Sequence, residues 1–154
     1  MICGIDPGAT GAIAMIYPGR ELHIEDMPML GKEVNGAAIA DLFKEFPATH
    51  IYIESQNSHM MGRQSAFNFG QGLGVIKGVI SAMRIPYTTV SPAMWKKKFS
   101  LARDKDASRG AAIRLFPERS DLFLRKKDDG RAEATLIALY GLEQTGGITN
   151  AKQE

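Results

Sequence analysis

Short apolar runs separated by turn residues fill the first part of the chain. Residues 1–6, 12–17 and 21–27 form three such runs, and each run fits one buried strand. Residues typical of turns, rich in glycine and proline, separate the runs at 7–11 and 18–20. Three strands joined by such short turns predict an antiparallel meander.

Helical spacing alternates with two more apolar runs along the rest of the chain. These runs predict strands at 51–53 and 85–90, and Pro86 places the second of them early in its strand or at a sheet edge. Helices are predicted over 35–46, 64–83, 91–98, from 104–106 to just before Pro117, and over 129–142. The whole pattern predicts an α/β fold with a five-stranded mixed sheet, an antiparallel meander plus parallel strands, and helices on both faces. We expect one domain over 1–146 and a polar tail over 147–154.

Four glycines interrupt the helical pattern of 64–83, at Gly70, Gly72, Gly74 and Gly78. Each costs a helix about 1 kcal/mol relative to alanine. Close packing against a sheet or against a second copy of the chain would explain their presence. We therefore expect this helix to form a homodimer interface.

Basic residues are concentrated in one segment, although the formal net charge of the chain is only +2. Twelve Lys or Arg and six Asp or Glu lie at positions 96–131, whereas the remainder holds seven and eleven. The segment therefore favours a positively charged face that binds a polyanion. Solvated helix faces are the alternative explanation of the same charges.

Several classes of protein are excluded by simpler features. The single cysteine, Cys3, rules out a disulfide framework within the chain. The first residues lack the basic region and apolar stretch of a signal peptide, and no run approaches the about 18 apolar residues that a membrane span needs. We therefore expect a cytoplasmic protein with no membrane partner.

Two acidic residues stand at the ends of predicted strands. Asp6 ends the first apolar run, and Glu54 ends the run at 51–53. Burying an unpaired carboxylate is costly, so neither residue fits as core filler. If the two strands are neighbours, both carboxylates lie at the same sheet edge. The alternative is that each acid caps a turn or pairs with a surface lysine.

A third acidic element opens the last predicted helix. Apolar residues follow Glu133 at three, four and seven positions, so Glu133 shares the face that meets the sheet. Asp129 lies one turn earlier on the same face. Helix N-capping by Asp128 or Asp129 accounts for the aspartates, but it leaves Glu133 without an explanation.

Converging carboxylates repel one another unless cations lie among them. Mg²⁺ prefers oxygen ligands, and two such ions about 3.5–4 Å apart can activate water and stabilise the leaving oxygen in phosphodiester hydrolysis. The basic segment would hold the phosphate backbone. The residues therefore predict a metal-dependent nuclease whose catalytic metal ligands are Asp6, Glu54, Asp129 and Glu133.

Six segments, in order along nearly the whole chain, resemble RuvC-type Holliday junction resolvases. The segments are 4–11 (GIDPGATG), 51–56 (IYIESQ), 69–75 (FGQGLGV), 90–97 (VSPAMWKK), 105–109 (KDASR) and 126–134 (KKDDGRAEA). The last three are most similar to phage and prophage members, and the plant plastid resolvase is similar there too. The first motif alone is moderately specific, but together with the second acid and the acidic helix the match is strong.

The resemblance implies a ribonuclease-H-like fold, a homodimer, and symmetric nicking of four-way DNA junctions with Mg²⁺ or Mn²⁺ and no small-molecule cofactor. It also implies a bacterial or phage-infected cell. Asp6, Glu54 and Glu133 match the first, second and last acids of the family. Bacterial members space the last two metal-site residues by three, which falls on Gly130 here. The phage-like motif instead favours Asp129, with Asp128 as the alternative.

The DNA contacts predicted from the basic residues and from the loop after Glu54 are Lys96, Lys97, Lys98, Lys105, Arg109, Arg63, His59 and Met60. Bacterial members carry an aromatic residue in that loop, and this chain offers Met60 or Met61 as a wedge between bases. A mobile loop is the alternative. Trp95 is predicted to be a core anchor rather than a base-stacking residue.

Three other functions remain open at this stage. A broader nuclease of the same fold would cut flaps, branched DNA or RNA–DNA hybrids with the same metal chemistry, and dimerisation distinguishes it from a resolvase. An ATP-dependent kinase or chaperone-like domain can share the opening motif, but 154 residues leave no room for a second nucleotide-binding half. An inactive DNA-binding module would have no reason to keep four converging acids.

Overall fold

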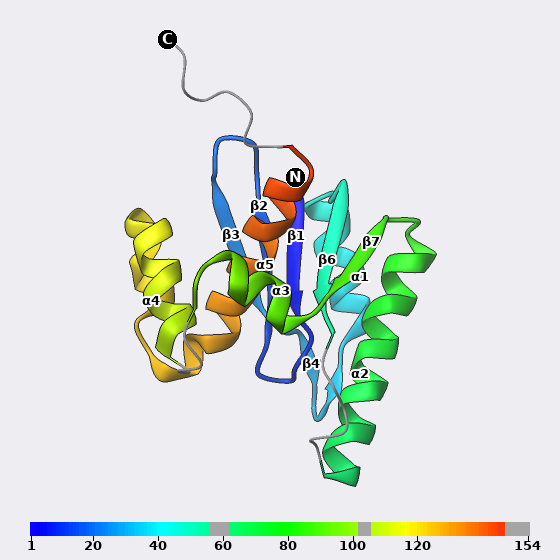
Figure 1. Ribbon diagram of the computed structural model, residues 1–154. Coiled ribbons are helices and arrows are strands. Elements are labelled where there is room, and N and C mark those ends of the chain that lie inside the picture. Colours follow the sequence, from blue (N-terminus) through cyan, green and yellow to red (C-terminus); the bar gives the residue numbers. More distant parts are fainter. Residues whose placement is uncertain (56–61, 102–105, 147–154) are drawn as a thin grey trace.

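A five-stranded mixed sheet forms the centre of the computed structural model, which describes residues 1–55, 62–101 and 106–146 (Figure 1). Its strands in chain order are β1 (Ile2–Asp6), β2 (Ala12–Ile16), β3 (Leu22–Asp26), β6 (His50–Glu54) and β7 (Tyr87–Val90). Their order across the sheet is β3-β2-β1-β6-β7. The predicted α/β class with a five-stranded mixed sheet is therefore confirmed.

Strand directions follow from how the strands are connected. Short turns make β1, β2 and β3 an antiparallel meander, as predicted. Longer connections that contain α1 and α2 make β6 parallel to β1 and β7 parallel to β6. Every residue of β1 and β2 is buried, which explains why their sequences read as continuous apolar runs. The strand after Pro86 lies at the sheet edge, as that proline predicts.

Helices cover both faces of the sheet, also as predicted. The helices α1 (Gly36–Glu45) and α2 (Arg63–Ala82) cover one face, and α3 (Pro92–Lys98), α4 (Asp106–Leu115) and α5 (Asp129–Gln144) cover the other. In Figure 1, α4 lies on the β3 side of the molecule and α2 lies on the β7 side. The predicted cap of α1 is present, because the Asn35 side chain accepts a hydrogen bond from the Ala38 N–H at 3.1 Å.

The last helix, α5, is more deeply buried than its sequence pattern indicates. Instead of a single apolar stripe, nearly every residue from Ala132 to Leu142 is buried. The sheet covers one side of α5, and α3, α4 and the segment after α4 cover the other. A Cβ at Gly4 of β1 would overlap the backbone of Ala134 and Ala138, so the helix lies directly on the sheet. This close approach brings the start of α5 to the carboxyl ends of β1 and β6.

Two kinds of short element were not predicted. A hairpin of β4 (Met29–Leu30) and β5 (Glu33–Val34) precedes α1, and its strands of two residues are too short to show alternation. The left-handed φ of +64° at Gly31 supplies its turn. The 3₁₀ helices η2 (Pro117–Phe123) and η3 (Lys126–Asp128) connect α4 to α5.

The glycines of α2 divide into two groups. A Cβ at Gly72 would lie 2.9 Å from the Val34 side chain, so this glycine lets the hairpin pack against the helix. Gly70, Gly74 and Gly78 face open space within the described chain. Only part of the glycine pattern is thus explained by packing inside one chain.

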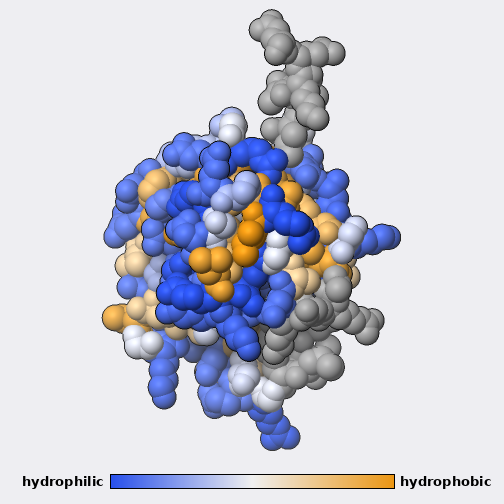
Figure 2. Space-filling model, turned by 90° about the vertical axis from the view of Figure 1, so that its left-hand side faces the viewer, coloured by the Kyte–Doolittle hydropathy of each residue, from blue (hydrophilic) through white to orange (hydrophobic). Residues whose placement is uncertain are grey.

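The outer surface over α4 is mostly hydrophilic, with apolar side chains gathered near the middle of that face (Figure 2). Among the described residues, no helix has the length and apolar character required to cross a lipid bilayer.

Candidate metal centre

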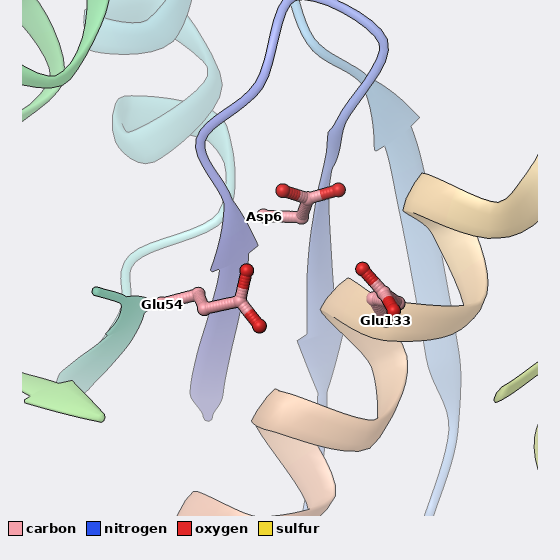
Figure 3. A group of neighbouring side chains, drawn as sticks. All are labelled: Asp6, Glu54 and Glu133. Carbon is pink, nitrogen blue, oxygen red and sulfur yellow. The ribbon is translucent and has the colours of Figure 1, made fainter. Parts of the chain in front are cut away.

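Asp6 and Glu54 lie side by side because the strands that carry them are parallel neighbours in register. Ile5 pairs with Ile53, so the next residue of each strand reaches the same sheet edge. Side chains alternate between the two faces of a strand, and Ile5 and Ile53 pack against α1 and α2. Asp6 and Glu54 therefore point to the opposite face, toward α5 (Figure 3).

Glu133 completes a cluster of three carboxylates from the first part of α5 (Figure 3). One carboxylate oxygen from each of Asp6, Glu54 and Glu133 lies within 4.8 Å of the others. Asp6 is 8% exposed and Glu54 is 3% exposed, whereas the Glu133 side chain retains 23% exposure. The cluster is therefore buried in the protein and open on the Glu133 side.

The surroundings of the cluster change the pKa of Asp6. Burial raises the pKa of Asp6 to about 7, and the carboxylates of Glu54 and Glu133 add to this rise. The Gly8 N–H, 3.4 Å from Asp6 Oδ1, and the ammonium of Lys96 act in the opposite direction without cancelling it. Near neutral pH the cluster therefore holds fewer negative charges than it has carboxyl groups.

Trp95 fixes the position of Glu54. Its indole Nε1–H donates a hydrogen bond to Glu54 Oε1 at 3.0 Å, and the whole residue is inaccessible to solvent. The prediction that Trp95 is a core residue agrees with this burial. Its contact with the predicted metal ligand was not foreseen, because nothing in the local sequence links α3 to β6.

Glu133 contacts Lys96 and Ser108 among the described residues. Lys96 Nζ lies 3.1 Å from Glu133 Oε1, and Ser108 Oγ donates to the same oxygen at 3.4 Å. The Lys96 ammonium also lies 5.0 Å from the centre of the Trp95 ring. Lys96, predicted as a DNA contact, thus sits at the open side of the three-acid cluster.

Asp129 lies outside this cluster and differs in its environment. Its Oδ1 is 2.7 Å from Arg109 Nε, and its side chain is 42% exposed. It nevertheless lines the same cavity as Asp6 and Glu133. The structure therefore brings three of the four predicted ligands together and places the fourth at the cavity wall, paired with Arg109. Its role as a ligand stays a prediction.

Asp128, the alternative ligand, has a structural role. It is 1% exposed, and its carboxylate accepts hydrogen bonds from the Arg125 backbone N–H at 2.8 Å and from the Arg125 guanidinium. Burial alone would raise the pKa of Asp128, but these bonds hold it below its usual range. The alternative explanation of the aspartates, helix N-capping, does not apply to the Asp128 side chain, since its carboxylate closes the preceding turn instead.

An ion pair between Arg131 and Asp26 joins α5 to the β1–β2–β3 meander. Arg131 binds Asp26 with two hydrogen bonds, of 2.6 Å from Nε and 2.7 Å from Nη2, and hydrogen bonding to Arg131 lowers the pKa of Asp26. This pair holds the start of α5 against the end of β3, which stabilises the position of Glu133 two residues further along.

The donor set fits a hard divalent cation. Three carboxylates, of which two are nearly inaccessible, converge within reach of one ion. Burial is the main cause of the raised Asp6 pKa, and a divalent ion would relieve the repulsion from Glu54 and Glu133 that adds to it. Among the residues that the structure describes, the cluster consists of carboxylates alone.

Two cavities flank the cluster and share Asp6, Ala9 and Thr10. One, of about 510 Å³, lies toward α5 and is lined by η3 and the first residues of α5. The other, of about 390 Å³, lies between the β4–β5 hairpin and α2. Asp6 therefore contributes to the wall of both cavities.

The residues predicted to contact DNA differ in their exposure and in their ion pairs. Lys97 and Arg63 are exposed, whereas Lys98 pairs with Glu143 at 2.8 Å and Arg109 pairs with Asp106 and Asp129. His59, Met60 and Lys105 lie outside the described residues. Sequence reasoning missed Lys126 and Lys127 as residues of the cavity beside Asp6, although their place in the acidic motif was a signal.

No protein-family model and no curated protein sequence matches the chain. Solved structures do match. Thermus thermophilus RuvC superposes with a TM-score of 0.69 in its complex with Holliday junction substrate, at 16% identity over 95% of this chain and 96% of RuvC. A second Thermus thermophilus RuvC structure gives 0.68, at 17% identity and the same two coverages of 95% and 96%.

A viral protein matches as well. The Fowlpox virus resolvase, in complex with its substrate Holliday junction DNA, has a TM-score of 0.58 at 16% identity over 94% of this chain and 99% of the resolvase. Identities this low show the fold. The chain therefore has the RuvC fold, and the predicted ribonuclease-H-like class is confirmed.

Proposed function

We propose that this protein is a metal-dependent endonuclease that resolves four-way DNA junctions by paired, symmetric nicks. The observation that carries the proposal is the buried cluster of Asp6, Glu54 and Glu133 in a chain with the RuvC fold. Two of the matching structures hold Holliday junction DNA, which supports branched DNA as the substrate class.

Asp6, Glu54 and Glu133 would hold Mg²⁺ or Mn²⁺, and Asp129 would join them after leaving Arg109. A pair of such ions supplies the activation of water and the stabilisation of the leaving 3′ oxygen. Trp95 keeps Glu54 aimed into the site through its N–H bond. The burial of Asp6 and Glu54 keeps bulk water away from the two carboxylates that would hold these ions.

Lys96 would exchange partners during the reaction. In the metal-free protein its ammonium offsets the charge of Glu133. A cation at the cluster would take over that role, which frees Lys96 to contact the DNA phosphate backbone at the open side of the site. Lys97, which is exposed on the same helix, is a second proposed phosphate contact.

Paired nicks require two active sites, so we propose that the protein acts as a homodimer. The α2 stripe, defined as Phe67, Gly70, Gly74 and Gly78, is the proposed contact surface. Phe67 is 66% exposed, and the glycines leave space for a second helix to approach closely.

Cleavage of a fixed four-way junction in Mg²⁺ tests the proposal, with linear duplex, flap and RNA–DNA hybrid substrates in parallel. We expect symmetric nicks on the junction and none from Glu54→Gln, which keeps the shape of the side chain but removes its charge. Equal cutting of flaps or hybrids would indicate a broader nuclease. Junction binding without cutting in Mg²⁺ or Mn²⁺ would contradict the nuclease assignment.

A further inference from the structure

The turn η3 presents two lysines to the cavity on the α5 side of Asp6. Lys126 and Lys127 are both exposed and both line the cavity of about 510 Å³ that also contains Asp6 and Glu133. They belong to the segment that connects η2 to α5, and the catalytic role proposed above does not use them.

These lysines differ from the other cations near the site because they carry unopposed charge. Arg125 is held by Asp128, Arg131 by Asp26, Arg109 by Asp129, and Lys96 by Glu133. Within the part of the chain that the structure describes, neither Lys126 nor Lys127 takes part in an ion pair. Their charge is therefore available to a ligand.

The backbone that carries the lysines is fixed. The buried carboxylate of Asp128 accepts the Arg125 N–H at 2.8 Å, and the Asp128 N–H donates to the Arg125 carbonyl at 2.9 Å, so the turn is closed on both sides. Asp128 leads directly into α5, which also carries Glu133. The lysines and Glu133 are thus carried by two consecutive helical segments.

The cavity on the α2 side offers no comparable charge. Its one lysine, Lys32, adjoins Glu33 in the same lining, and its remaining polar residues are neutral apart from Asp6. The α5-side lining also contains four acids besides Asp6, and each is paired with a basic residue other than Lys126 and Lys127: Asp26 with Arg131, Asp128 with Arg125, Asp129 with Arg109, and Glu133 with Lys96. The two lysines are therefore the charges that this lining can offer to a polyanion.

We propose that Lys126 and Lys127 bind the DNA phosphates that flank the scissile phosphate on the α5 side of the active site. This inference rests on the proposed nuclease function and names a substrate contact of that same site. Each lysine neutralises one backbone phosphate, so the pair strengthens binding and sets which phosphate lies over the acids.

The test is the salt dependence of junction binding in the absence of cleavage, with Ca²⁺ in place of Mg²⁺. Lys126→Ala/Lys127→Ala should weaken binding about 10- to 100-fold near 0.1 M salt, because two phosphate contacts are lost. The slope of log affinity against log salt concentration should fall by about 2. Lys126→Arg/Lys127→Arg, which keeps both charges, should restore the slope.

The matched control is Lys44→Ala/Arg84→Ala, which removes the same charge from α1 and from the turn that follows α2. We expect its slope to equal that of the wild type. Equal slopes for the Lys126/Lys127 double variant and the wild type, with both folded by thermal melting, would overturn the inference.

Failure of the proposed function gives a different result. Wild-type protein that binds junctions with a lysine-dependent slope but never cuts them would remove the nuclease assignment and leave the phosphate contact standing. Wild-type protein that cuts junctions, with a salt slope that is the same in the Lys126→Ala/Lys127→Ala variant, would support the nuclease function and overturn the phosphate contact.

Discussion

Asp6 makes the stability of the metal-free protein depend on pH. Its pKa of about 7 in the folded state compares with 3.8 for an ordinary aspartate. Between these values the folded state holds a proton that the unfolded state has released. The free energy of unfolding should therefore fall as the pH rises from about 4 to about 7.

We predict that Asp6→Asn removes this dependence, because the amide has nearly the same shape and never ionises. In EDTA, the variant should be more stable than the wild type at pH 8 by on the order of 4 kcal/mol, and equally stable near pH 4. Urea unfolding at pH 4, 6 and 8 measures the difference. Adding Mg²⁺ should stabilise the wild type and leave the variant unchanged. Parallel pH profiles for the two proteins would be inconsistent with a raised Asp6 pKa.

Trp95 provides a test of how Glu54 is positioned. Trp95→Phe keeps an aromatic side chain in the core but deletes the N–H that binds Glu54 at 3.0 Å. We predict that the affinity for Mn²⁺, measured by calorimetric titration, falls about 10-fold, as for other residues that orient metal ligands. Cleavage should recover at saturating metal.

Phe123→Leu is the control for Trp95→Phe, because Phe123 is equally buried on the same side of the sheet and has no polar group to lose. It should lower thermal stability without changing metal affinity. An unchanged Mn²⁺ affinity in Trp95→Phe would show that its N–H does not orient Glu54.

The sequence pattern predicted the three clustered acids but not the ion pair of Asp129, and the reason is physical. Asp6 and Glu54 could be found because a carboxylate at the end of a buried strand is costly and therefore informative. The helical position of Glu133 placed it toward the sheet. The pairing of Asp129 with Arg109 could not be found in this way, since Arg109 comes from a different helix and spacing along α5 says nothing about it.

At the level of secondary-structure elements, the close packing of α5 on β1 determines whether Glu133 lies beside Asp6 and Glu54. Gly4→Ala would push a methyl group into the backbone of Ala134 and Ala138, which cannot move as a side chain can. We predict a loss of about 3 kcal/mol in the free energy of unfolding, at the upper end for overpacked cores. Cleavage should fall with it, because Glu133 moves with α5.

The comparison for Gly4→Ala is Gly110→Ala in α4. A Cβ there meets only the far end of the Arg114 side chain, at 3.5 Å. Helix propensity then makes the alanine variant more stable by about 0.5–1 kcal/mol. Chemical denaturation of both variants provides the measurement. A neutral Gly4→Ala would mean that α5 is not seated on β1 as described.

The periodicity of apolar residues predicted the longer helices and strands and missed the shortest ones. Strands and helices of ordinary length were predicted within a few residues of their observed bounds, because their apolar spacing is long enough to recognise. The β4–β5 hairpin was missed since two residues carry no period. The helix α5 has apolar residues on every side, so its sequence revealed one buried face and concealed the second.

At the scale of the whole molecule, the proposed symmetric cutting needs two active sites. The described residues of one chain contain a single three-acid cluster, so paired nicks require a second chain at a fixed distance. The α2 stripe is suited to that contact, because Gly70, Gly74 and Gly78 cost helix stability and pack against nothing in the described chain. Contact with a second helix would offset that cost.

Gly74→Leu, in the middle of the stripe, tests the dimer directly. The leucine should hold the helices of the two copies apart, so sedimentation should report a monomer where the wild type is a dimer. The monomer should retain its three-acid cluster, since a Cβ added at this exposed position meets no other atom in the described structure. We therefore predict that it nicks junctions singly and loses the paired cuts. Asp41→Leu places the same side chain on the exposed face of α1 and should change neither property. A Gly74→Leu protein that stays dimeric and still makes paired cuts would move the interface away from α2.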